Sequence, residues 1–75
     1  MPVSSAIVEI EEGTDEAVLS GLSSMHAVTV YGMKENKIVI VIDADSLGVI
    51  EESTMKIMSI EGVTGVFPVY SSVDE

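Results

Sequence analysis

Residues 38–42 read Ile-Val-Ile-Val-Ile and are followed by Asp43-Ala44-Asp45, and this run constrains the fold more than any other feature of the chain. A strand with one face in water alternates apolar and polar residues, whereas this strand is apolar on both faces. A chain of 75 residues has material for one layer of helices, not two. The second face is therefore either an apolar surface that lowers solubility or a place where a partner binds.

The composition is that of a small folded protein without cysteine chemistry. With 47% hydrophobic residues, the chain is expected to form a single domain over residues 1–75, with an ordered core at about 5–70. It has no cysteine, which excludes disulfides, thiolate metal sites and a cysteine nucleophile. The sequence has neither a run of about 18 apolar residues nor a basic-then-apolar N-terminus. We therefore expect no membrane insertion, no signal peptide and a cytoplasmic location.

The charge of the chain is strongly acidic. Thirteen Asp and Glu residues accompany only three lysines (Lys34, Lys37 and Lys56), so the net charge is −10. Nucleic acids and anionic membrane surfaces are disfavoured as partners, because their recognition draws on Lys and Arg. A cationic peptide is the natural complement of such a surface. The alternative is that the acidic residues only keep a small apolar protein in solution.

Apolar periodicity and turn residues predict four strands. They are expected at residues 5–10, 27–33, 37–44 and 63–70, with helical patterns after the first and third and a hairpin between the second and third. The order βαββαβ predicts an α+β, ferredoxin-like sandwich in which a four-stranded antiparallel sheet carries two helices on one face. The first and third strands are then central. Pro68 fits an edge strand, which is where the fourth strand lies in this topology.

The helices are predicted from their caps and their apolar spacing. Thr14 is the expected N-cap of the first helix, either Asp45 or Ser46 that of the second, and Gly62 the left-handed residue that ends the second. The residues expected at helical spacing on the core-facing sides are Val18, Leu19, Leu22, Met25, Leu47, Ile50, Thr54, Ile57 and Met58. Among the methionines, Met25 and Met58 are thus expected in the core, and Met33 and Met55 at the surface.

Parity along each strand separates the two faces of the sheet. Asp43 belongs in water, so Val39 and Val41, which share its parity, are expected on the open face; Glu9 places Ile7 there by the same reasoning. The residues expected to face the helices are Ala6, Val8, Ile10, Val28, Val30, Ile38, Ile40, Ile42 and Ala44.

The two edge strands complete the candidate interaction face. On the second strand, Thr29 and Tyr31 are expected to point outward. On the fourth, Phe67 and Val69 are expected in the core, which leaves Val66 and Tyr70 outward. The candidate face comprises Ile7, Glu9, Thr29, Tyr31, Val39, Val41, Asp43, Val66 and Tyr70. An apolar patch of this kind indicates a partner peptide or protein, or the pairing of two open sheets in a dimer.

No catalytic constellation is present, so we expect no enzyme activity, no cofactor and no metal site. His26, the only histidine, is expected to be a turn or capping residue rather than a general base. Asp43-Ala44-Asp45 ends a strand and caps a helix, and no further ligands follow at the spacing of a calcium loop. The six glycines form no phosphate-binding motif.

Three segments, in this order and spacing, resemble the NapD family. They are residues 5–9 (Ser-Ala-Ile-Val-Glu), residues 37–44 (Lys-Ile-Val-Ile-Val-Ile-Asp-Ala), and residues 60–63 (Ile-Glu-Gly-Val) followed by Val69-Tyr70. NapD is the small cytoplasmic chaperone of the periplasmic nitrate reductase. The resemblance implies that the chain binds the twin-arginine (Tat) signal peptide of the catalytic subunit, NapA. It also implies that the peptide binds as a helix across the sheet while the molybdenum cofactor is inserted into the precursor.

Two other functions share the predicted topology. A small-molecule regulatory domain of the ACT type pairs side by side through its edge strands, although Pro68 interrupts one of these edges. A purely structural module would self-associate through the open sheet. A signal-peptide chaperone, by contrast, is expected to be a monomer or a weak dimer.

Overall fold

The computed structural model describes the backbone of residues 3–72 and the side chains of residues 3–69. Four strands and two helices alternate in the predicted order βαββαβ. Their bounds are β1 (Val3–Ile10), α1 (Asp15–Ser23), β2 (Val28–Lys34), β3 (Lys37–Asp43), α2 (Leu47–Met58) and β4 (Val63–Ser72).

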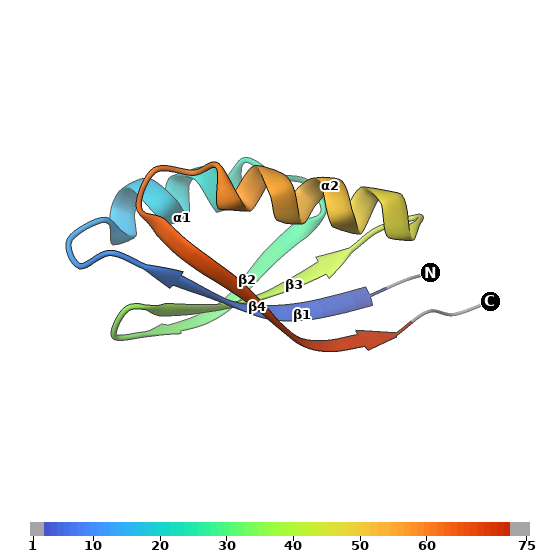
Figure 1. Cartoon of the computed structure of the whole chain (residues 1–75), viewed down its shortest axis with the longest axis horizontal. Helices are drawn as coiled ribbons and strands as arrows, with labels where there is room; N and C mark the ends of the chain where they lie inside the picture. The colour runs from blue at the N-terminus through green and yellow to red at the C-terminus, as the bar shows by residue number, and fades with distance from the viewer. Residues whose placement is uncertain (1–2, 73–75) are drawn as a thin grey trace.

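The strands form one antiparallel sheet in the order β2-β3-β1-β4, so β1 and β3 are central and β2 and β4 are the edges. Both helices lie on the same face of this sheet, and the opposite face carries neither of them (Figure 1). The predicted α+β, ferredoxin-like fold is therefore confirmed. The observed arrangement also leaves one side of β3 without a helix (Figure 1), as expected for a chain of 75 residues that has material for only one helical layer.

The core lies between the helices and the sheet, and β3 supplies its centre. Ile38 and Ile40 are fully buried and Ile42 nearly so, while Val39 and Asp43 of the same strand are exposed. This alternation confirms the faces that parity assigns to β3. The other buried apolar residues of the core are Ala6, Val8, Ile10, Val18, Leu22, Val28 and Ile57.

Each helix begins at a predicted cap, but only one cap forms the expected hydrogen bond. The Ser46 hydroxyl accepts a hydrogen bond from the Val49 backbone N–H at 3.3 Å, so Ser46 rather than Asp45 caps α2. Thr14 occupies the N-cap position of α1, but its hydroxyl donates to the Glu11 carbonyl at 2.6 Å. That bond closes the turn between β1 and α1.

Gly62 ends the connection from α2 to β4 in the predicted left-handed conformation, with φ of +104°. A Cβ at this position would lie 2.7 Å from the Cβ and Oγ1 atoms of Thr14. The Glu11 backbone N–H also donates to the Gly62 carbonyl at 2.7 Å. The α2–β4 connection and the β1–α1 turn are therefore held together at a point where only glycine fits.

The faces predicted for Val66, Phe67 and Val69 of β4 are wrong. Val8 lies opposite Val66, and Val66 packs against the core. Ile7 lies opposite Phe67, which is 50% exposed, and Val69 is exposed as well. Its size favours Phe67 as a core residue. Its pairing with Ile7, however, places it on the open face of the sheet. Val66 therefore does not belong to the open face.

The core-facing stripe of α2 is rotated from the predicted one. Ile57 is buried and Ile50 and Thr54 are half-buried, as expected, but Met58 is 59% exposed and Leu47 is exposed. Ser53 takes a buried position instead. Met25 packs against the core as predicted, and Met33 and Met55 are exposed. Within residues 3–72, neither helix is long and apolar enough to cross a membrane.

Candidate functional site: the open face of the sheet

The open face is apolar at its centre because the two middle strands present valine and isoleucine there. Ser5 lies opposite Val41 and Ile7 opposite Val39, and opposed residues in an antiparallel pair project to the same face. Ile7 and Val41 are half-buried and Val39 is 42% exposed, although both helices lie on the other side of the sheet (Figure 1). An uncovered apolar strip of this kind is typical of an interaction surface.

Phe67 of β4 adds an aromatic ring to this face. It lies opposite Ile7, and the distal part of its ring lies over Gly65: a Cβ at position 65 would be 2.9 Å from the Cε2 and Cζ atoms of Phe67. Because residue 65 has no side chain, the ring can lie along the strand rather than project into water. The sequence signal for this arrangement is a glycine two residues before an aromatic residue on the same face of a strand.

β2 borders the open face along β3. Thr29 lies opposite Val41 and is exposed, as predicted. The register shifts between Val30 and Gly32, so Tyr31 is an extra residue in β2, and its side chain is exposed. A bulge of this kind twists an edge strand and hinders its pairing with another chain.

A shallow hollow of about 330 Å³ lies at the hairpin side of the strip. Its lining joins two residues of the apolar strip, the exposed Met33 and three charged residues of the hairpin: Ile7, Val39, Met33, Lys34, Glu35 and Lys37. Methionine is flexible and polarisable, which suits a surface that adapts to a bound apolar chain.

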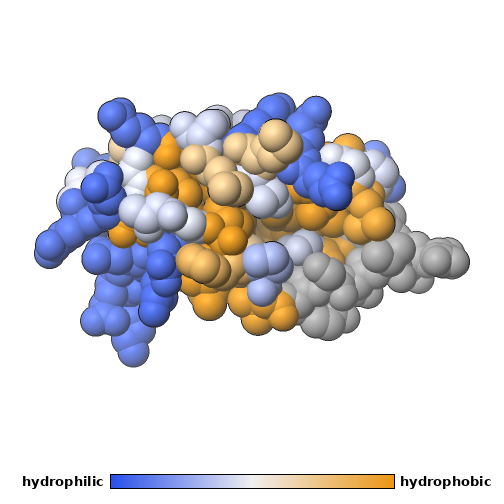
Figure 2. All heavy atoms as spheres, in the orientation of Figure 1, coloured by the Kyte–Doolittle hydropathy of each residue, from blue (hydrophilic) through white to orange (hydrophobic). Residues whose placement is uncertain are grey.

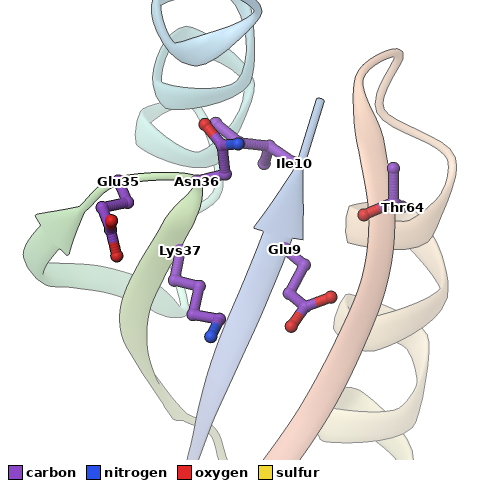
Figure 3. A pocket seen from close by; sticks show the side chains of 6 residues that line it. All are labelled: Glu9, Ile10, Glu35, Asn36, Lys37 and Thr64. Carbon is purple, nitrogen blue, oxygen red and sulfur yellow. The ribbon is translucent and has the colours of Figure 1, made fainter. Parts of the chain in front are cut away.

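The two ends of the open face differ in charge. At the hairpin end, Glu9 lies directly opposite Lys37. A polar hollow of about 360 Å³ opens there, lined by Glu9, Ile10, Glu35, Asn36, Lys37 and Thr64 (Figure 3). At the other end, Asp43 is exposed opposite Val3. Figure 2 views the molecule from the side and shows hydrophilic residues gathered at the hairpin and loop end and apolar residues across the middle.

Most of the predicted face is brought together by the fold. Six of its members lie on the open side of the sheet and a seventh is exposed at the bulge of β2: Ile7, Glu9, Thr29, Val39, Val41 and Asp43, with Tyr31 at the bulge. Val66 lies on the other side, and the side chain of Tyr70 lies outside the described residues. Phe67 replaces Val66 as the apolar contribution of β4.

The remaining candidate residues form no second site. His26 is exposed in the connection between α1 and β2, away from the open face. Among the described residues, no three His, Cys, Asp or Glu side chains come close enough together to hold a metal ion. What the open face offers is an apolar strip with carboxylates at both ends, which suits a chain that carries both apolar and cationic residues.

The comparisons with known proteins identify the family. No curated protein matches the sequence significantly. The family profile described as NapD protein matches residues 1–75, which is the whole of this sequence. The family supports a role as a chaperone in nitrate reductase maturation, with a protein partner in that process. The chain thus belongs to the NapD family, the chaperone family for nitrate reductase.

Proposed function

We propose that this protein binds the twin-arginine signal peptide of the nitrate reductase catalytic subunit, NapA, in the cytoplasm. The observation that carries the proposal is the uncovered apolar strip of Ile7, Val39, Val41 and Phe67 in a member of a chaperone family. A twin-arginine leader combines arginines with an apolar segment. It therefore matches both the strip and the carboxylates at its ends.

The apolar segment of the leader supplies most of the affinity. Covering about 400 Å² of apolar surface contributes on the order of 10 kcal/mol before the costs of association and ordering are subtracted. Ordering a flexible leader into a helix opposes binding by a few kcal/mol. The net affinity then depends on how well the leader fills the strip and the hollow beside Met33.

Charge gives the interaction its selectivity. A net charge of −10 attracts a cationic leader and repels acidic chains. The arginines of the leader can pair with carboxylates of the open face such as Glu9 or Asp43, with bidentate geometry. The chaperone needs no catalytic step, because a signal peptide covered by the sheet cannot reach the translocase before cofactor insertion is complete.

A titration of isotope-labelled protein with a synthetic NapA leader tests the proposal. We expect chemical-shift changes centred on Ile7, Val39 and Val41, with weaker binding when both arginines of the leader are replaced by lysine. The amides of the α2 surface near Met55 serve as an internal control. Absence of shifts at several hundred micromolar leader would contradict the proposal and return an ACT-type ligand domain or a self-associating module to consideration.

A pair of charge variants tests whether the leader binds to the open face of the sheet or to the helical layer. Val41→Glu places a carboxylate in the middle of the apolar strip and is expected to weaken leader binding at least tenfold while the fold stays intact. Met55→Glu adds the same charge on α2, where Met55 is 71% exposed, and is the matched control. Equal affinities of the two variants for the leader would exclude the open face as the binding surface.

A further inference from the structure

Glu9 and Phe67 come together on the open face although they lie on different strands. Glu9 is directly opposite Gly65 in the β1–β4 pair, and the distal part of the Phe67 ring lies over Gly65. The ring therefore starts opposite Ile7 and reaches along β4 to the position opposite Glu9. The register and the missing side chain at residue 65 thus place the half-buried residue Glu9 next to Phe67, which is 50% exposed.

The carboxylate of Glu9 is oriented toward the ring side of its strand. In Figure 3 it points from β1 toward β4, whereas the ammonium of Lys37 lies on the β3 side of β1. Lys37 is exposed, so its attraction for Glu9 is screened by solvent and leaves the β4 side of the carboxylate accessible. Glu9 also lines the polar hollow at the hairpin end, which gives a bound side chain room to enter.

We infer that Glu9 and Phe67 form a subsite for one arginine side chain of the bound leader; this inference rests on the proposed function. The planar guanidinium stacks on the ring of Phe67 and donates two hydrogen bonds to the carboxylate of Glu9. Arginine suits this pair better than lysine, because a guanidinium is planar, less strongly hydrated and able to bind a carboxylate with two donors at once. The subsite thus explains how the open face discriminates a twin-arginine leader from another cationic, apolar peptide.

The subsite also fixes the direction of the leader. One arginine lies at the hairpin end of the sheet, and the apolar segment crosses Ile7, Val39 and Val41 toward the end that carries Asp43. Asp43 therefore provides a matched control, since it is an exposed carboxylate on the same face at the opposite end.

The test measures the affinity of the full chain for two synthetic leaders, one with its arginine pair and one with lysines in their place. We expect wild type to bind the arginine leader about tenfold more tightly. Phe67→Leu, which keeps an apolar side chain but removes the ring, and Glu9→Gln each reduce this ratio to less than about twofold. Asp43→Asn lowers the affinity for both leaders alike and preserves the ratio.

A spectroscopic signal distinguishes stacking from a general loss of apolar contact. The side-chain protons of one leader arginine shift upfield in the wild-type complex, because they lie over the Phe67 ring, and this shift disappears with Phe67→Leu. A loss of affinity for the lysine leader in that variant measures the apolar contribution of the ring separately. Circular dichroism of each variant confirms that the fold is retained.

The outcomes distinguish a failure of the subsite from a failure of the proposed function. If wild type binds neither leader, the proposed function itself fails. If wild type binds and discriminates, but Phe67→Leu and Glu9→Gln leave the ratio at its wild-type value, only the subsite is overturned. If Asp43→Asn abolishes the ratio instead, the arginine lies at the opposite end of the face and the inferred direction is wrong.

Discussion

Substitutions at two neighbouring residues of β3 should affect stability and leader binding differently, because the two side chains project to opposite faces of the sheet. Ile40 is fully buried among the core residues, whereas Val39 is 42% exposed on the open face. Ile40→Ala removes buried carbon atoms and leaves a cavity, which costs about 3 kcal/mol. Val39→Ala removes atoms that already contact water in part, and it costs less than about 1 kcal/mol.

These values can be measured by urea denaturation followed by far-UV circular dichroism. A domain of 75 residues has a free energy of unfolding of roughly 4–11 kcal/mol. With a denaturant dependence of about 1 kcal/mol per molar urea, Ile40→Ala lowers the unfolding midpoint by about 3 M, and Val39→Ala by less than about 1 M.

Leader affinity is expected to change in the opposite order. Val39→Ala removes apolar area that the bound leader covers, which corresponds to about 1 kcal/mol, or about a fivefold rise in Kd. Ile40→Ala leaves the open face unchanged, so its Kd stays within about twofold of wild type at urea-free conditions where it remains folded. Equal stability losses in the two variants would mean that both faces of β3 are covered in solution. A larger loss of affinity in Ile40→Ala would refute the assignment of the binding face.

Two further predictions concern the connections that hold the layers together. Gly62→Ala is expected to destabilise the protein by at least about 2 kcal/mol, because the new Cβ clashes with Thr14 in addition to the strain of φ +104°. Gly13→Ala, with φ of +87° but open space around it, should cost only about 1 kcal/mol, and urea denaturation that ranks the two equally would contradict this reasoning. Ser46→Ala removes the cap of α2 and is expected to lower the free energy of unfolding by about 1 kcal/mol, whereas Ser46→Gly should cost only a few tenths. Thermal unfolding of wild type and the two Ser46 variants measures these differences, and a melting temperature of Ser46→Ala equal to that of wild type would show that the cap contributes nothing.

The faces of β1 and β3 can be read from the sequence because each strand carries a charged residue that settles its parity. Glu9 and Asp43 belong in water, and the alternation then places every other residue of the strand. β4 carries no charged residue between Val63 and Tyr70, so residue size is the only indication of which side chains face the core. In the structure, the register with β1 determines which residues of β4 face the core. This register is interrupted by shifts between Ser5 and Ala6 and between Glu9 and Ile10. Such shifts depend on long-range pairing and leave no local sequence signal.

The exposed position of Phe67 has a similar origin. Its ring is accommodated by Gly65, so the apolar contact that keeps it on the sheet is local, although a large aromatic residue ordinarily indicates the core. α2 shows the opposite case. Its small polar residue Ser53 is buried, whereas the larger apolar Met58 remains exposed. For Phe67 the missing side chain of Gly65 outweighs hydrophobicity, and only the packed structure reveals that contact.

The acidic charge of the chain has opposite effects on two equilibria of the open face. It opposes the stacking of two copies and favours the binding of a cationic leader. Two copies stacked on their open faces, about 18 Å apart, would each bring a charge of −10, and their repulsion is roughly 20 kcal/mol before screening and roughly 2 kcal/mol at physiological salt. A cationic leader on the same face is attracted instead. Added salt should therefore strengthen self-association while it weakens leader binding, and sedimentation and leader titration across one salt series measure both. If both equilibria moved in the same direction, apolar contact alone would govern the face, and the charge would serve only to keep the protein in solution.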